Sequence, residues 1–361
     1  MNERLLDDVY YAAATWEVPR RLVMKAEWLE KGGSPRVIKV LSMIGIRYFF
    51  AGLAVVLLGT PSAAWGQLSE IDSWTATLHV EYRVISNITY HVASSHEGKL
   101  DLYVPLDMEK RHPTAIYIHG GGWSRGAKED NALLILPYIA RGWAVVNVGY
   151  RLADVSLAPA AVEDCRCALW WVLRNASKYN FDTDRIVITG LSAGGHLALT
   201  TGMLPRSTEL DLRCPPITES QIVPLDPKEF KVAAIINWFG ITDVVDLLDG
   251  PNQKAYAVNW FGNQLDREAI AQRVSPLTYV RSDLPPILTI HGDADRVVPY
   301  SHAVQLHDAL TRAGVPNQLF TIPKGDHGIF TRDQMRQVYE TIWSFLDRHG
   351  VQSKVKEDPD R

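Results

Sequence analysis

The sequence predicts an α/β protein with a mostly parallel central sheet, an antiparallel leading edge and helices on both faces of the sheet. Strand-like segments rich in β-branched and aromatic residues recur from residue 77 onward, and segments of helical periodicity separate the later ones. The first two strand-like segments follow each other without a helix between them, which favours antiparallel pairing at that edge. No internal repeat is visible.

Each expected strand has a pattern that suits its place in the sheet. Residues 77–85 and 99–105 alternate apolar and polar side chains, as half-buried strands do. The later strands are β-rich apolar runs of the central type, at residues 114–120, 143–150, 185–190, 232–240, 286–292 and 317–323. The clearest helical segments are residues 159–179, 194–203, 301–313 and 332–348. Because ligands of open α/β sheets bind beyond the carboxyl ends of the strands, the residues that follow the strands are expected to line one site.

Composition argues against several classes of function. The 361 residues include 37 basic and 41 acidic side chains, a formal net charge of −4, so nothing indicates a nucleic-acid-binding protein. Cysteine and histidine do not show zinc-ligand spacing, and neither a metal nor another cofactor is expected. Three cysteines do not make a disulfide scaffold, although Cys214 could pair with Cys165 or with Cys167.

The N-terminal segment differs from the rest of the chain. Arg47 precedes an apolar run that is short for a bilayer span and ends in small residues, which is the arrangement of a secretory signal peptide. Residues 43–66 form a well-proportioned signal peptide if translation begins at Met43, so we expect export and interpret residues 1–42 as an extension from a mis-assigned start. The alternative is an uncleaved membrane anchor over residues 47–66, or a helix packed on the domain.

The segment GLSAGG, residues 190–195, lies between a predicted strand and a predicted helix. This setting is the one in which a G-x-S-x-G turn exposes a nucleophilic serine. Gly190 and Gly194 permit a tight turn without Cβ clashes, and the turn would raise the Ser192 hydroxyl above the sheet. We therefore predict that Ser192 is a nucleophile, since a serine that only caps a helix needs no glycine on both sides.

A serine hydroxyl needs a general base, and the base needs an orienting acid. His327, in KGDHGIF after the last predicted strand, is the expected base, because the order serine, acid, histidine suits this turn. Asp295, in HGDADRVVP after a strand, is the expected acid. Asp293 in the same loop is expected to make loop hydrogen bonds, and Asp326 adjoins His327 too closely in sequence to orient its ring.

Three glycines follow a strand in YIHGGGWSRGAK, residues 117–128. Acyl transfer places negative charge on a carbonyl oxygen, and preorganised amide groups stabilise that charge. The expected donors are the amides of Gly121, Gly122 and Ala193, the last being the residue after the nucleophile. Glycines let consecutive N–H groups turn inward, whereas a flexible linker would not explain the flanking histidine and tryptophan.

Together, HGGGW, GLSAGG, HGDADRVVP and GDHG resemble the α/β-hydrolase family. Over about residues 75–348 the chain looks most like the hormone-sensitive-lipase-like esterase branch and the related bacterial acetylxylan and feruloyl esterases (BD-FAE-type hydrolases). The resemblance implies the α/β-hydrolase fold, with a catalytic domain over residues 67–350 and a charged tail over residues 351–361. It also implies serine carboxylic ester hydrolysis through an acyl-enzyme.

The family places substrate-shaping insertions between core elements, and the expected small cap segments here are residues 204–230 and 241–284. Short-chain acyl or aromatic esters, of acetyl or feruloyl type, are the expected substrates, either as small molecules or linked to a polysaccharide. The aromatic side chains that could line the pocket, or instead pack the cap onto the core, are Trp123, Tyr256, Trp260 and Phe261.

Three other functions stay open. One is an amide hydrolase of arylformamidase type. Another is a serine peptidase, although HGGG argues against it and the chain has no room for a propeller before residue 75. The last is a non-catalytic binding protein on the same fold, which an intact set of serine, histidine and acid disfavours.

Overall fold

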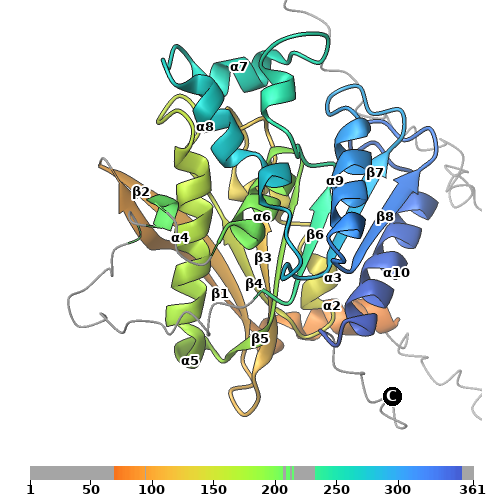
Figure 1. Cartoon of the computed structure of the whole chain (residues 1–361). Coiled ribbons are helices and arrows are strands. Elements are labelled where there is room, and N and C mark those ends of the chain that lie inside the picture. Colours follow the sequence, from red (N-terminus) through yellow and green to blue (C-terminus); the bar gives the residue numbers. More distant parts are fainter. Residues whose placement is uncertain (1–68, 94, 206–208, 212–213, 215–231, 352–361) are drawn as a thin grey trace, which may run out of the picture. The chain divides into compact units, whose positions relative to one another are not determined.

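The computed structural model describes residues 69–93, 95–205, 209–211, 214 and 232–351 (Figure 1). The expectations for residues 1–66, for most of the first cap segment and for the charged tail beyond residue 351 lie outside these residues. Among the helices that the structure describes, none has the length and apolar character needed to cross a bilayer.

Eight strands form one mixed sheet in the order β1-β2-β4-β3-β5-β6-β7-β8. β1 pairs with β2 and β2 with β4 in antiparallel fashion, and every other neighbouring pair is parallel. The mostly parallel sheet with an antiparallel leading edge is therefore confirmed. The strands are β1 (Tyr82–Ala93), β2 (His96–Pro105), β3 (His112–Ile118), β4 (Ala144–Val148), β5 (Phe181–Leu191), β6 (Ala234–Trp238), β7 (Ile287–Gly292) and β8 (Asn317–Ile322).

Helices cover both faces of this sheet (Figure 1). Alternate side chains of β3 enter different cores: Ile116 and Ile118 join the core that α4, α6 and α9 share, whereas Ala115 and Tyr117 join the core of α3 and α10. The α-helices are α2 (Glu70–Glu81), α3 (Leu136–Ile139), α4 (Ala160–Arg174), α5 (Ala176–Tyr179), α6 (Ala193–Met203), α7 (Ala255–Phe261), α8 (Arg267–Val274), α9 (Ser301–Arg312) and α10 (Arg332–Arg348). Short 3₁₀ turns lie at η1 (Lys128–Asn131), η2 (Glu209–Asp211), η5 (Val245–Leu247) and η6 (Pro276–Tyr279).

The expected strand over residues 77–85 is wrong in its first half, because α2 continues to Glu81. The Ser69 side chain caps this helix by accepting a hydrogen bond from the amide of Asp72 at 3.1 Å. Trp74 and Leu78 lie one helical turn apart and both pack against the core of α3 and α10. The four-residue apolar spacing therefore decides the structure here, and the alternation seen in the sequence begins to form a strand only at residue 82.

The predicted helix over residues 159–179 consists of two helices, α4 and α5, which are divided at Asn175. Cys167 on α4 forms a disulfide bond with Cys214, while Cys165 is buried with a free thiol. Residues two apart on a helix point in different directions, so only one of these two cysteines can face Cys214. The structure thus selects one of the two pairings that the sequence left open.

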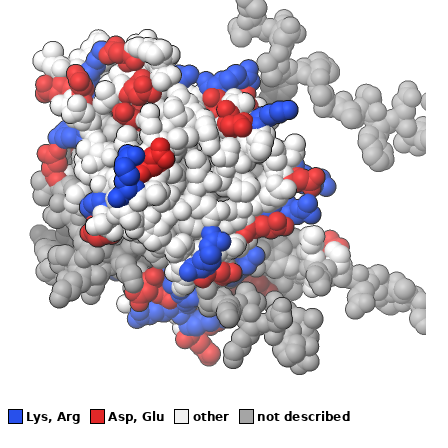
Figure 2. All heavy atoms as spheres, turned by 45° about the vertical axis from the view of Figure 1, so that its right-hand side comes forward, with Lys and Arg blue, Asp and Glu red and all other residues white. Residues whose placement is uncertain are grey.

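Basic and acidic side chains are interspersed on the side of the molecule where α10 and β8 lie (Figure 2). On the described part of this face, no extended region carries one sign of charge. Such a face lacks the basic stripe along which a nucleic-acid backbone binds.

Candidate active site

Ser192 lies in the turn between β5 and α6 and has a left-handed backbone, with φ 56° and ψ −120°. Such a conformation is strained for a residue with a Cβ and persists only where the surrounding structure holds it. A Cβ on Gly190 would lie 2.4 Å from the carbonyl oxygen of Gly194, and a Cβ on Gly194 would lie 2.2 Å from that of Ile118. Both positions therefore require glycine, and the tight turn leaves the Ser192 side chain at the end of β5.

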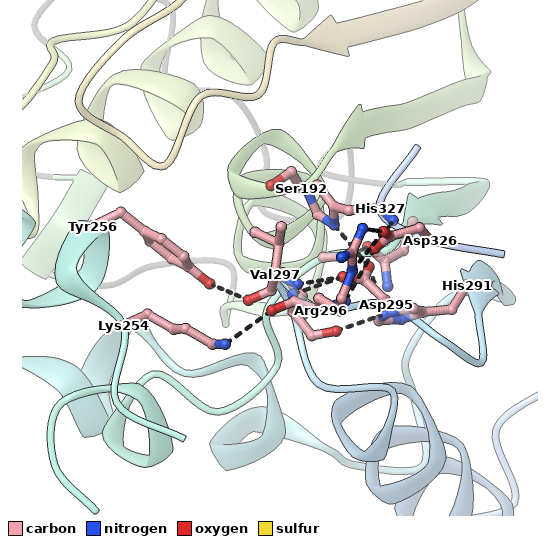
Figure 3. Close-up of polar contacts among 12 residues, drawn as sticks. Ser192, Lys254, Tyr256, His291, Asp295, Arg296, Val297, Asp326 and His327 are labelled. Atoms are coloured by element: carbon pink, nitrogen blue, oxygen red, sulfur yellow. Dashed lines mark hydrogen bonds and ion pairs between the residues drawn. The ribbon is translucent and has the colours of Figure 1, made fainter. Parts of the chain in front are cut away.

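The imidazole of His327 reaches this hydroxyl from the loop that follows β8. Its Nε2 lies 2.9 Å from Ser192 Oγ (Figure 3). The ring of Phe239 packs edge-on against the imidazole, with 4.6 Å between the ring centroids. A neutral imidazole in this position can accept the proton of the hydroxyl through Nε2.

Asp295 holds the other nitrogen of the same ring. Its Oδ2 accepts a hydrogen bond from His327 Nδ1 at 2.7 Å, and its side chain is fully buried. Burial alone would raise the pKa of Asp295, but hydrogen bonds from His291 and His327 outweigh it and hold that pKa well below its usual range. The carboxylate is therefore ionised and fixes the proton of the imidazole on Nδ1.

Among the described residues, the other two aspartates near His327 have partners other than its ring. Asp293 Oδ1 accepts the amide of Lys324 at 2.5 Å, which is the loop hydrogen bonding expected of it. Asp326 Oδ1 accepts the backbone amide of His327 at 2.8 Å, and the same carboxylate pairs with the guanidinium of Arg296 (Figure 3). Hydrogen bonds from Arg296 lower the pKa of Asp326 to about 2. Of the three aspartates, Asp295 alone contacts the imidazole.

The glycine loop after β3 has a backbone that few other sequences could adopt. Gly121 and Gly122 have φ values of 111° and 59°, and a Cβ on Gly121 would lie 2.0 Å from the carbonyl oxygen of Arg125. Among the described residues, the amides of Gly121, Gly122 and Ala193 donate no hydrogen bond. Unpaired amides in the glycine loop and directly after Ser192 are donors that can bind an oxyanion.

Two histidines support the site in ways that the sequence analysis did not predict. The ring of His119 stacks on Tyr150 at 4.2 Å, and its Nδ1 donates to the carbonyl oxygen of Gly120 at 2.8 Å, so it holds the glycine loop. His291 Nε2 lies 3.2 Å from Asp295 Oδ2 and 3.1 Å from the carbonyl oxygen of Val298. The only sequence signal for either was its place directly before a glycine at the end of a strand.

The four aromatic residues of the expected pocket divide into two groups. Trp123 and Trp260 are fully buried and stack at 4.1 Å, and the equally buried Phe261 packs edge-on against Trp260 at 5.2 Å. These three rings pack the cap onto the core. Of the two expected roles, they therefore have the packing role and do not line an open pocket. Tyr256 is half-buried, and its Cβ would lie 3.0 Å from a Cβ placed on Gly122. Tyr256 therefore borders the glycine loop.

The BD-FAE family model matches residues 100–310, which is more than half of the chain. The match runs from β2 into α9. It includes the glycine loop, Ser192 and Asp295, whereas His327 lies beyond it.

Two curated relatives are named as ester hydrolases. Esterase LipQ of Mycobacterium tuberculosis is 27% identical over 259 residues, which are 69% of this chain and 59% of LipQ. The probable carboxylic ester hydrolase LipM of the same organism is 30% identical over 57% of this chain and 46% of LipM. The chain thus spans about half to three fifths of the length of these two relatives.

Two similar solved structures are covered by this chain over nearly their whole length, in contrast to the two relatives above. A truncated form of a carbohydrate esterase from gut microbiota is 28% identical, with a TM-score of 0.61, over 75% of this chain and 97% of that chain. The thermophilic esterase Est2 of the Planctomycetes species Thermogutta terrifontis is 25% identical, with a TM-score of 0.61, over 77% of this chain and 95% of that chain. The chain has the α/β-hydrolase fold and belongs to the BD-FAE family.

Proposed function

We propose that this protein is a serine carboxylic ester hydrolase. The observation that carries the proposal is the run of contacts from Ser192 Oγ through the imidazole of His327 to the buried carboxylate of Asp295. A hydroxyl, a base and an orienting acid in this order are the groups that acyl transfer uses. The similar proteins that are named esterases support the same reaction class.

In the first half of the reaction, Ser192 Oγ attacks the ester carbonyl carbon while its proton passes to His327 Nε2. Asp295 stabilises the imidazolium that forms. The carbonyl oxygen becomes an oxyanion and accepts hydrogen bonds from the unpaired amides of the glycine loop and of Ala193, each worth about 3–4 kcal/mol in such sites. The imidazolium then gives its proton to the leaving alcohol, the ester C–O bond breaks, and the acyl group stays on Ser192.

In the second half, a water molecule takes the place of the alcohol. His327 Nε2 accepts one proton of this water, and the resulting hydroxide attacks the acyl carbon. The oxyanion forms again in the same place. When it collapses, Ser192 Oγ leaves and regains its proton from the imidazolium, and the carboxylic acid is released.

Short-chain acyl or aromatic esters, of acetyl or feruloyl type, are the substrates that we propose. The cap between β6 and β7 is short, and its half-buried Tyr256 borders the glycine loop, which suits a small or planar acyl group better than a long chain. A similar solved structure is named a carbohydrate esterase. Esters carried by a polysaccharide are therefore included beside small-molecule esters.

A panel of acetyl, butyryl, octanoyl and feruloyl esters, with N-formylkynurenine added, tests the proposal. Ser192→Ala should lower kcat by about 10⁶-fold and still fold, because one hydroxyl is removed. Ser301→Ala, which removes an exposed hydroxyl at the start of α9, should keep the wild-type rate. If the protein turned over only N-formylkynurenine, it would be an amide hydrolase instead. If the folded protein turned over none of the substrates, the binding-protein alternative would be favoured.

We also propose that the protein is exported. The signal-like segment over residues 43–66 is one support, and the disulfide between Cys167 and Cys214 is a second, because disulfides persist in oxidising compartments. N-terminal sequencing of the protein from the producing cell tests this. A mature end near residues 65–68 would support export with cleavage, and a mature chain that keeps residues 1–42 would contradict it.

A further inference from the structure

The acid loop, defined as residues 293–299 between β7 and α9, is bound to the cap by two hydrogen bonds. Lys254 Nζ donates to the carbonyl oxygen of Arg296 at 3.0 Å, and the Tyr256 hydroxyl donates to that of Val297 at 3.1 Å (Figure 3). Lys254 is the N-cap of α7, and Tyr256 is the second residue of that helix. The start of one cap helix thus binds two successive carbonyl groups of the acid loop.

The amide groups of the same two peptide units hold the carboxylate of Asp295. In the peptide that joins Arg296 to Val297, the carbonyl oxygen accepts the hydrogen bond from Lys254, and the N–H donates to Asp295 Oδ1 at 2.8 Å. In the peptide that joins Val297 to Val298, the carbonyl oxygen accepts the hydrogen bond from Tyr256, and the N–H donates to Asp295 Oδ1 at 2.9 Å. Each planar peptide therefore lies between a donor of the cap and the carboxylate.

The two oxygens of Asp295 have different partners. Oδ2 faces the rings of His327 and His291. Among the described residues, Oδ1 receives hydrogen bonds only from the two amides of the acid loop. The orientation of these amides consequently sets the rotation of the carboxylate and, through Oδ2, the direction of the His327 imidazole.

We propose that Lys254 and Tyr256 are positioning residues that act on Ser192 through the acid loop, Asp295 and His327. The proposal rests on the serine mechanism above. A donor on the carbonyl fixes the plane of each peptide and strengthens the hydrogen bond that its N–H makes, because linked hydrogen bonds polarise one another. Tyr256 is the stiffer of the two, since its ring lies against Gly122 and 5.9 Å from the ring of Trp123.

Removal of single donor groups tests this with an acetyl ester as substrate. Tyr256→Phe should lower kcat about tenfold and Lys254→Met about threefold, each with KM unchanged, in keeping with the loss of one hydrogen bond. Lys254→Arg, which keeps a donor, should restore most of the rate. Tyr279→Phe is the matched control, because Tyr279 is also half-buried and its hydroxyl donates to the carbonyl oxygen of Arg273 at 2.7 Å; it should keep the wild-type kcat.

The same variants in an Asp295→Ala background give the decisive measurement. If Lys254 and Tyr256 act through Asp295, they should have no further effect on kcat once the carboxylate is gone. An equal fall in both backgrounds would overturn the proposal, and so would a rise in KM at constant kcat, which would assign Tyr256 to direct substrate contact. Absence of any Ser192-dependent turnover in the wild type would instead refute the proposed function itself.

Discussion

The imidazole of His196 is fully buried between α6, the glycine loop and the cap. Its Nδ1 accepts a hydrogen bond from Trp123 Nε1 at 3.2 Å, and its Nε2 donates to the carbonyl oxygen of Val274 at 2.7 Å. A neutral ring with its proton on Nε2 meets both requirements, because an indole nitrogen can only donate. If Nδ1 were protonated, its N–H would face the N–H of Trp123, and neither donor would have an acceptor in this buried site.

Burial lowers the pKa of His196 from 6.5 to about 4, although the hydrogen bond to the carbonyl of Val274 opposes the shift. As the pH falls below 6.5 the ring in the unfolded chain binds a proton, whereas the ring in the folded protein stays neutral until about pH 4. The unfolded state binds more protons in this window, so stability that is fully present above pH 6.5 is lost as the pH falls toward 4. Between about pH 7.5 and 4.5, this linkage removes about 2–3 kcal/mol from the free energy of unfolding.

Urea unfolding followed by tryptophan fluorescence can measure this loss in the wild type and in His196→Gln. Glutamine keeps a donor and an acceptor but does not titrate, so the variant should lose about 2–3 kcal/mol less than the wild type over the same pH range. Other buried histidines contribute equally to both proteins. His79→Gln, at an exposed position, should follow the wild type. Equal losses in the wild type and His196→Gln would refute the buried neutral imidazole.

Two further predictions concern the backbone and the disulfide. Gly194→Ala should lower the free energy of unfolding by more than about 3 kcal/mol in thermal unfolding, because its Cβ would meet backbone; Gly142→Ala, which has open space but φ +75°, should lose only about 1–2 kcal/mol. Cys167→Ser should lose about 4 kcal/mol in urea unfolding, since the bond closes a loop of 47 residues. Cys165→Ala should lose about 1 kcal/mol, and a loss as large as that of Cys167→Ser would contradict the assigned pairing.

The fold was predictable from the sequence where local pattern and tertiary packing agree. The buried central strands are continuous apolar runs, and their order along the chain with intervening helices leads to a mostly parallel sheet. The first expected strand failed because two periodicities coexist there. Alternation over residues 77–85 indicates a strand, whereas the four-residue spacing of Trp74 and Leu78 is typical of a helix. The packing of these two side chains against a core that is distant in sequence decides for the helix, and no local pattern reveals that contact.

The candidate site was predictable to the extent that its residues follow strands directly. Gly190 and Gly194 are required by backbone contacts within the turn and with the end of β3, and the G-x-S-x-G motif between a strand and a helix already indicates both. The donors to the acid loop could not be predicted, because Lys254 and Tyr256 lie 42 and 41 residues from their acceptors in sequence. A surface lysine and a cap tyrosine have no residue pattern that specifies which carbonyl groups they bind.

The acid loop and the loop over residues 323–331, which carries His327, are held together because the strands before them, β7 and β8, are neighbours. β7 pairs with β8, and a Cβ on Gly292 would lie 2.2 Å from the carbonyl oxygen of Gly325, so the two loops leave their strands in backbone contact. The amide of Ala294 donates to that same carbonyl at 3.0 Å. Arg296 and Asp326 then join the loops further along, and with a pKa of about 2 the carboxylate of Asp326 stays ionised at neutral pH.

The nucleophile turn belongs to a different part of the sheet, since β5 and β7 are separated by β6. Its shape depends on glycine contacts with the backbone of β3, whereas the direction of His327 depends on the acid loop and thus on the cap. A change in the cap therefore reaches Ser192 through the 2.9 Å contact with His327 Nε2 rather than through the turn. For this reason Tyr256→Phe is expected to alter the rate in a protein of unchanged fold, while Gly194→Ala is expected to destabilise the fold itself.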